Sequence, residues 1–137
     1  MKKRIEIVKG WVKKAEHDLR IALNALETMK EPPLDTICFH AQQCVEKYLK
    51  AYLTYYGIEF PPTHELGDLA LLCSTVDRDF EQFLFEVTTL TPYAVEIRYP
   101  ELVSEPTLED TKSALAIAKK VKNFVLDRLP PELKGVF

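Results

Sequence analysis

Residues 35–56 read DTICFHAQQCVEKYLKAYLTYY, and this stretch decides the fold that we expect for the chain. Apolar side chains recur in it every three or four residues, which is the spacing of one face of an α-helix. Phe39, Leu49 and Leu53 are also apolar but point away from that face. A helix that is apolar on more than one side is expected to lie centrally or at a subunit contact. The main face consists of Ile37, Ala41, Cys44, Val45, Tyr48, Ala51, Tyr52 and Tyr55.

The sequence around this helix marks its ends and those of its neighbours. Asp35 is predicted as the N-cap and Gly57 as the C-terminal stop. The chain has nine prolines, and the stretches between them are helix candidates, because proline is excluded from helix interiors. They predict helices over 4–30, from 63 or 64 to 76, over 79–90 and over 107–129, with a short helical turn and loop over 93–106.

The last of these helices has its own start signal. Thr107-Leu108-Glu109-Asp110 resembles a capping box in which Asp replaces the usual Glu. No stretch alternates between apolar and polar residues over a useful length, so no strand is expected. The sequence therefore predicts an all-α fold, an up-and-down helical bundle of about five helices that forms one domain over residues 1–137.

Composition and charge narrow the function classes. Hydrophobic residues make up 47% of the 137 and charged residues 28%, which is typical of a globular protein rather than a disordered one. The net charge is −3, with basic ends and an acidic middle: residues 1–30 hold eight Lys/Arg against four Asp/Glu, and residues 61–105 hold two against nine. A protein that coats long nucleic acid is usually basic overall, so DNA is not expected as a partner. A small anion or a short RNA remains compatible with this distribution.

Cysteine usage and hydropathy suggest a cytoplasmic protein. Cys38, Cys44 and Cys73 are odd in number and form no CxxC pair, which favours reduced thiols over a disulfide scaffold. Charges interrupt the first residues, so no signal peptide is expected, and no apolar run is long enough to span a membrane. His40 and Cys44 are one helical turn apart, with His64 or Cys73 as further candidates, but structural zinc usually shows tighter paired spacings. We expect neither metal nor cofactor.

A narrow polar stripe stands out on the predicted helix over 35–56. At 100° per residue, His40, Gln43, Lys47 and Lys50 fall within a sector about 80° wide. Lysine supplies point charge to phosphate, and glutamine can read a base edge or a ribose. The alternative is an ordinary solvated face held by pairing of Glu46 with Lys50.

The same helix resembles the signature helix of HEPN domains, the nucleotide-binding domains of higher eukaryotes and prokaryotes. Residues 39–51, FHAQQCVEKYLKA, carry the resemblance. Further matches are AEHDL at 15–19, THEL at 63–66 and RYP at 98–100. Their order and spacing extend the resemblance over roughly residues 10–128.

The resemblance implies a helical bundle that is commonly dimeric. Many HEPN domains are encoded beside a minimal nucleotidyltransferase, and some of these two-component systems are toxin–antitoxin pairs. Other members cleave RNA with an Arg followed, after four to six residues, by a His. That pair suits the reaction, because His can move protons at the 2′-OH and Arg can stabilise charge at phosphorus.

The linear nuclease motif is absent from this sequence. From Arg98 the His would fall at residues 103–105, which are Val, Ser and Glu, and no other arginine has a His at that spacing. A spatial pair of Arg98 with His40 or His64 stays open. We therefore expect a non-catalytic nucleotide-binding protein that acts as a homodimer with a minimal nucleotidyltransferase partner in a toxin–antitoxin-like system.

The polar stripe and the RYP stretch together form the predicted binding site. A nucleotide or short RNA is expected to bind at His40, Gln43, Lys47, Lys50, Arg98 and Tyr99. The alternatives are an RNA-cleaving toxin with a non-standard active site, or a pure dimeric interaction module with Phe39, Leu49 and Leu53 as its dimer face.

Three further features allow two interpretations each. Arg98 could bind ligand or pair with a nearby Glu, with Tyr99 as a lid. His64 could join the polar stripe or tie down its loop through a backbone carbonyl. His17 is expected to be exposed. The basic first helix could face RNA or an acidic partner, although a solvated surface is the more common reason for such a face, and no aromatic residues are interleaved to stack bases.

Overall fold

The computed structural model describes residues 2–96 and 105–134, and every regular element within those residues is helical. The predicted all-α fold is thereby confirmed. The three long helices are α1 (Lys2–Thr28), α2 (Leu34–Tyr55) and α6 (Leu108–Asp127). The shorter elements are α3 (Leu66–Ser74), a 3₁₀ helix (Arg78–Phe83), α4 (Leu84–Thr88), α5 (Pro92–Glu96) and a final 3₁₀ turn (Pro131–Leu133).

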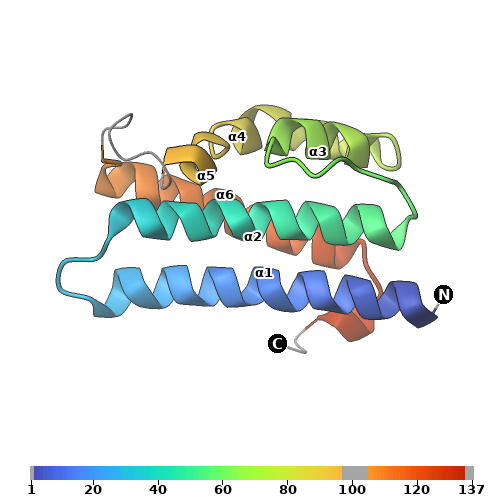
Figure 1. Cartoon of the computed structure of the whole chain (residues 1–137), viewed down its shortest axis with the longest axis horizontal. Helices are drawn as coiled ribbons and strands as arrows, with labels where there is room; N and C mark the ends of the chain where they lie inside the picture. The colour runs from blue at the N-terminus through green and yellow to red at the C-terminus, as the bar shows by residue number, and fades with distance from the viewer. Residues whose placement is uncertain (1, 97–104, 135–137) are drawn as a thin grey trace.

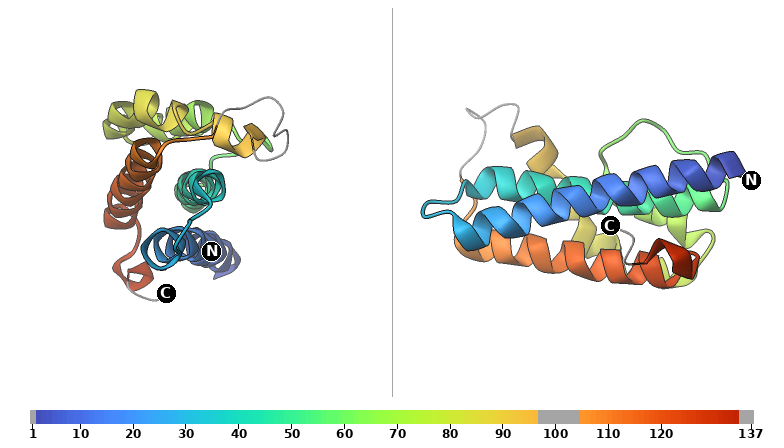
Figure 2. Two further views of the ribbon diagram at one scale, coloured as in Figure 1. Left: turned by 90° about the vertical axis from the view of Figure 1, so that its left-hand side faces the viewer. Right: turned by 90° about the horizontal axis from the view of Figure 1, so that it is seen from below.

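Helix α2 lies in the middle of the bundle (Figures 1 and 2). It contacts α1, α3, α5 and α6, and α1 runs antiparallel to both α2 and α6. The short helices α3 to α5 form a layer on the side of α2 away from α1. This central position follows from a sequence that is apolar around most of the helix, as expected.

The core fills the space between α2 and its neighbours. Tyr48, Tyr52 and Phe80 are among its largest fully buried side chains. Leu49 and Leu53 are also fully buried within the chain, so the alternative in which these two join Phe39 in a dimer face is wrong for both leucines. Burial of one such leucine contributes about 1.5–3 kcal/mol relative to exposure, which explains why both face the protomer's own core.

The ends of α2 differ in how well the sequence predicted them. Gly57 has φ of +70°, a left-handed conformation that favours glycine, and it ends the helix as expected. The N-cap prediction for Asp35 is wrong, because Pro33 holds that place and its carbonyl accepts the amide of Ile37. Asp35 lies in the first turn, and its carboxylate accepts the amide of Thr36.

Two further boundaries depart from the prediction. Helix α3 begins at Leu66, later than expected, because the residues before it are held in a loop by side-chain hydrogen bonds. The stretch predicted as one helix over 79–90 is divided into a 3₁₀ helix and α4. A 3₁₀ helix brings residues i and i+3 into line, which places Phe80 and Phe83 together in the core.

The start of α6 is the predicted capping box. The Thr107 hydroxyl accepts the amide of Asp110 at 3.0 Å, and the Asp110 carboxylate accepts the amide of Thr107 at 2.9 Å. Each bond satisfies one of the amides that a helix N-terminus leaves without a backbone partner.

The thiols and the hydropathy of the helices complete the fold. Cys38, Cys44 and Cys73 are free and buried, and burial raises the pKa of the Cys44 and Cys73 thiols. They behave as small apolar side chains rather than as nucleophiles. Within the described part of the chain, no helix combines the length and the apolar character needed to cross a membrane.

Candidate functional site

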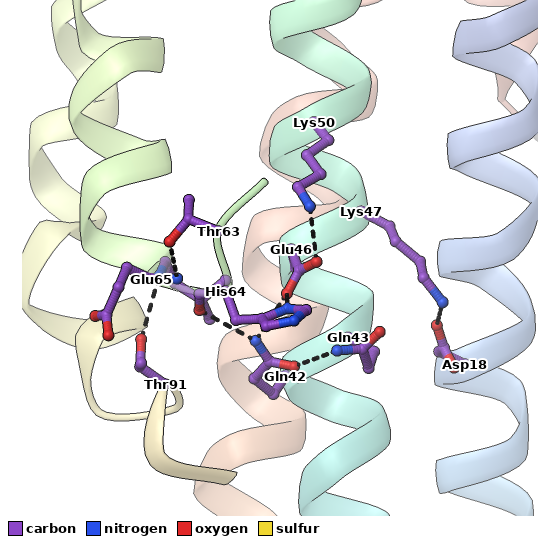
Figure 3. Close-up of polar contacts among 11 residues, drawn as sticks. Asp18, Gln42, Gln43, Glu46, Lys47, Lys50, Thr63, His64, Glu65 and Thr91 are labelled. Atoms are coloured by element: carbon purple, nitrogen blue, oxygen red, sulfur yellow. Dashed lines mark hydrogen bonds and ion pairs between the residues drawn. The ribbon is translucent and has the colours of Figure 1, made fainter. Parts of the chain in front are cut away.

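Polar side chains gather where the middle of α2 meets α1 and the loop before α3 (Figure 3). We call this cluster the α2 polar site. Most of its members come from successive turns of α2, where i, i+3 and i+4 spacing brings them to neighbouring faces. Its members are Asp18 from α1, His64 from the loop, and His40, Gln42, Gln43, Glu46, Lys47 and Lys50 from α2.

Glu46 is the centre of one half of the site. Its carboxylate accepts hydrogen bonds from Lys50 Nζ at 2.9 Å and Gln42 Nε2 at 3.1 Å, and its Oε1 lies 2.8 Å from His64 Nδ1. Gln42 also donates to the His64 backbone carbonyl at 3.4 Å. The Gln43 amide donates to Gln42 Oε1 at 2.7 Å, so the two amides are oriented as one network.

Asp18 is the centre of the other half. Its two carboxylate oxygens lie 2.6 Å from Lys47 Nζ and 2.8 Å from His40 Nδ1. Asp18 itself is buried, whereas the His40 and Lys47 side chains are 23% and 20% exposed. The fold brings one acid from α1 against two nitrogen groups that are about two turns apart on α2.

Lys50 lies inside the protein rather than at its surface. Its side chain is only 10% exposed, and its ammonium lies 5.6 Å from the Trp11 ring centre and 5.7 Å from that of Phe60. These cation–π contacts and the ion pair with Glu46 hold the charge where water has little access. Lys50 therefore acts on Glu46 rather than on a solute.

The charges of the site balance one another. Two carboxylates, Asp18 and Glu46, face two ammonium groups, Lys47 and Lys50. Burial favours the protonated form of Glu46, but hydrogen bonds from Lys50, His64 and Gln42 outweigh it and hold the pKa of Glu46 below its ordinary value of 4.5. With neutral imidazoles the site carries no net charge. Excess positive charge alone therefore does not attract an anion to it.

His64 is the most exposed member of the site. Its side chain is 52% exposed while its Nδ1 meets the buried Glu46 carboxylate. The His64 ring thus ties the loop to α2 through the Glu46 carboxylate and not, as expected for a structural role, through a backbone carbonyl, and the bond from Gln42 to the His64 carbonyl adds to this link. A buried carboxylate at Nδ1 fixes the orientation of the ring, and the described residues provide no hydrogen bond to Nε2.

A second polar link joins α1, α2 and α6 within the core. The Tyr48 hydroxyl donates to Glu16 at 2.5 Å, and Lys122 Nζ lies 2.8 Å from the same carboxylate. Burial and the bond to Glu16 raise the pKa of the Tyr48 hydroxyl far above its ordinary value, so it stays protonated. This link joins the three helices and shares no residue with the α2 polar site.

The structure brings together part of the predicted site. His40, Gln43, Lys47 and Lys50 all belong to the α2 polar site, whereas Arg98 and Tyr99 fall outside the described residues. His17 is exposed, as expected.

Sequence reasoning missed the acidic partners of these cations. Asp18 and Gln42 were not singled out, and Glu46 was considered only as a helix-surface partner of Lys50. The available signal was the position of Asp18 in AEHDL and of His64 in THEL, two of the four matched stretches.

The site offers no metal-binding arrangement. Across residues 2–96 and 105–134, no three His, Cys, Asp or Glu side chains are grouped as ligands for one ion. Cys44, the thiol considered next to His40, is fully buried.

Known proteins resemble the chain in sequence and in fold. The sequence profile of the HEPN domain matches residues 8–129. Putative toxin MJ1304 from Methanocaldococcus jannaschii is 30% identical over 140 residues, which cover 91% of this chain and 90% of that protein.

Two crystal structures share the fold. ST0689, an archaeal HEPN homologue, is 28% identical with a TM-score of 0.70 and covers 88% of this chain and 96% of its own. TT1696 from Thermus thermophilus is 26% identical with a TM-score of 0.72 and covers 89% of this chain and 98% of its own. With the family profile spanning nearly all of α1 to α6, the chain belongs to the HEPN domain family.

Proposed function

We propose that the chain is the HEPN component of a toxin–antitoxin-like pair and binds a nucleotide or a short RNA at the α2 polar site. Family membership and the relative named as a toxin support the first part. The observation that carries the second is the half-exposed His64 ring, which is fixed by a buried Glu46 beside the oriented amides of Gln42 and Gln43. Fixed donors of this kind suit a base edge or a ribose.

The predicted residues differ in whether they can contact a ligand. Lys50 is buried in its pair with Glu46, so we assign it a positioning role. His40, Gln43, Lys47 and His64 are partly exposed or exposed and are assigned to the ligand. A phosphate that approaches Lys47 competes with Asp18, which lies 2.6 Å from the ammonium. Binding therefore depends on hydrogen bonds as well as charge, and Arg98 and Tyr99 remain predicted contributors.

Titration calorimetry with ATP, GTP and UTP tests this binding. We expect at least one nucleotide to bind with a Kd below about 1 mM, and expect Lys47→Ala and Gln43→Ala each to weaken it roughly tenfold, about 1.4 kcal/mol. Lys112→Ala is the matched control, because it removes an exposed lysine of α6, a helix that contributes no residue to the site. If no nucleotide binds, or if the control loses as much affinity as Lys47→Ala, the assignment of the site is wrong.

The partners are proposed on the family's pattern. We infer a homodimer that acts with a minimal nucleotidyltransferase, which would carry the group-transfer chemistry. Light scattering after gel filtration should give roughly twice the 15.8 kDa of one chain, and a higher mass when the nucleotidyltransferase is added. A monomeric mass that does not change when the nucleotidyltransferase is added would refute this proposal.

RNA cleavage is a second candidate because of one specific arrangement. Both His40 and His64 place Nδ1 2.8 Å from a buried carboxylate, Asp18 and Glu46 respectively. A carboxylate at Nδ1 makes the opposite nitrogen suitable for general acid–base chemistry at a 2′-OH. Incubation with total RNA distinguishes the candidates: cleavage that disappears in His64→Ala or His40→Ala establishes an enzyme, and intact RNA leaves the binding function.

A further inference from the structure

A basic surface follows the line where α1 and α6 lie side by side, away from the α2 polar site. The ion pair of Glu16 with Lys122, at 2.8 Å, joins the two helices along this line. Lys13 and Arg20 lie three residues before and four after Glu16, and Lys119 lies three before Lys122. Residues at these spacings share a helix face, so all four cations border the same seam. We call Lys13, Arg20, Lys119 and Lys122 the basic seam.

The side chains of the seam are available to a solute. Lys13, Arg20 and Lys119 are exposed, and Lys122 is partly exposed. For Lys13 and Lys119, the described residues provide no acidic partner within ion-pair distance. Both helices are long and straight, and they run antiparallel (Figures 1 and 2). The cations are therefore held on a rigid scaffold rather than on loops.

Charge on the seam is strongly unbalanced. Glu16 is the carboxylate that the four cations border, and its own charge is already bound to Lys122 and to the Tyr48 hydroxyl. Burial favours the protonated form of Glu16, but these hydrogen bonds, together with the nearby charges of Lys122 and Arg20, hold its pKa below 4.5. The α2 polar site pairs each ammonium with a carboxylate, whereas the basic seam leaves the positive charges of Lys13 and Lys119 uncompensated by the described residues.

The chemistry of the seam favours a phosphate backbone over a protein. Stable protein interfaces rely on buried aromatic or aliphatic anchors, and the strongly exposed isoleucines of α1, Ile7 and Ile21, lie about 100° or more around the helix from Arg20. Sequence-independent nucleic-acid binding instead needs only Lys and Arg that can replace counterions on phosphates. We propose that the basic seam binds the phosphate backbone of RNA, independently of the ligand at the α2 polar site.

Fluorescence anisotropy with a labelled oligouridylate of about 20 nucleotides tests this proposal on the full chain. At about 50 mM NaCl we expect the double variant Lys13→Glu, Lys119→Glu to bind at least roughly tenfold more weakly than wild type. Lys120→Glu reverses one charge on α6, half the change of the double variant, at a side chain that pairs with Glu86 away from the seam, and should change the Kd less than about threefold. For wild type, the slope of log K against log[salt] should approach about −2 to −3, because each phosphate on a single strand contributes about −0.7.

Two further measurements keep the result interpretable. The milder double variant Lys13→Gln, Lys119→Gln should also lose affinity, and thermal unfolding must show that both double variants fold. The variant Lys13→Gln, Lys119→Gln should keep the nucleotide affinity that calorimetry measures at the α2 polar site, which separates this proposal from that site. Unchanged affinity in a folded double variant would overturn the proposal. So would competition by polyglutamate as effective as that by unlabelled RNA, since that result would assign the seam to an acidic protein.

Discussion

Asp18 determines how Lys47 can meet a ligand. The carboxylate holds the ammonium at 2.6 Å and also binds His40. Asp18→Asn removes the charge while it keeps an oxygen for hydrogen bonding, which leaves the α2 polar site with one net positive charge. We expect nucleotide affinity to rise several-fold, as measured by calorimetry. An unchanged or lower affinity in a folded Asp18→Asn protein would show that Lys47 does not touch phosphate.

Glu46 stabilises the native state by holding Lys50 and His64. Glu46→Gln leaves the Lys50 ammonium buried without an anion, which costs about 3–5 kcal/mol in comparable buried pairs. Urea unfolding at neutral pH measures the loss. Glu59→Gln, which removes an exposed carboxylate elsewhere, should change the free energy of unfolding by less than about 0.5 kcal/mol. A loss no larger than that of Glu59→Gln would contradict the role assigned to Glu46.

The same residue predicts a pH dependence of stability. The pKa of Glu46 is lower in the folded protein than its ordinary 4.5, so the folded state favours the ionised carboxylate. This contribution is complete above the ordinary pKa and is lost as the pH falls through the folded pKa. Urea unfolding from neutral to acid pH should show a shallower acid decline for Glu46→Gln than for wild type. Parallel curves for the two proteins would contradict the stabilised carboxylate.

At the scale of helices, two glycines predict opposite effects of the same substitution. Gly57 adopts φ of +70° at the end of α2, where Ala is strained and its Cβ would meet Arg4 at 3.3 Å. Gly10 lies inside α1, and an added Cβ there meets nothing within 4 Å. We expect Gly57→Ala to destabilise by about 1–2 kcal/mol and Gly10→Ala to stabilise by about 0.5–1 kcal/mol in urea unfolding. If the two substitutions changed the free energy of unfolding in the same direction, that result would contradict the backbone geometry.

The capping box of α6 is a second test at this scale. Thr107→Ala removes the hydroxyl that accepts the Asp110 amide and should lower the free energy of unfolding by about 1 kcal/mol. Ser113→Ala, at an exposed position of the same helix, is the matched control and should be neutral or slightly stabilising. An unchanged free energy of unfolding in Thr107→Ala would mean that water satisfies the Asp110 amide as well as the hydroxyl does.

How far the sequence predicted the elements depended on the range of the forces involved. Apolar spacing and capping residues are local, and they located α1, α2 and α6 to within a few residues. The late start of α3 at Leu66 depends on the bond from His64 to Glu46, which are eighteen residues apart, and local patterns do not contain it. The division of residues 79–90 likewise follows from packing Phe80 and Phe83 into the core.

The tertiary packing of the whole bundle explains why the sequence predicted only part of the candidate site. One helix wheel was enough to align His40, Gln43 and Lys47, because all three belong to α2. The acids that neutralise the site arrive from tertiary packing, and Asp18 meets Lys47 across twenty-nine residues of chain. The two lysines of the stripe are consequently not equivalent, since Lys50 is enclosed by the bundle and Lys47 remains partly exposed.

One measurement tests the central claim most directly, namely that a nucleotide binds at the α2 polar site. Amide chemical shifts of the ¹⁵N-labelled protein can be followed while the mononucleotide identified by calorimetry is added. The account predicts that the largest changes fall on residues 40–47 and 63–65, and that they are smaller in Lys47→Ala at the same nucleotide concentration. Shifts confined to other parts of the chain, or none at millimolar nucleotide, would contradict it.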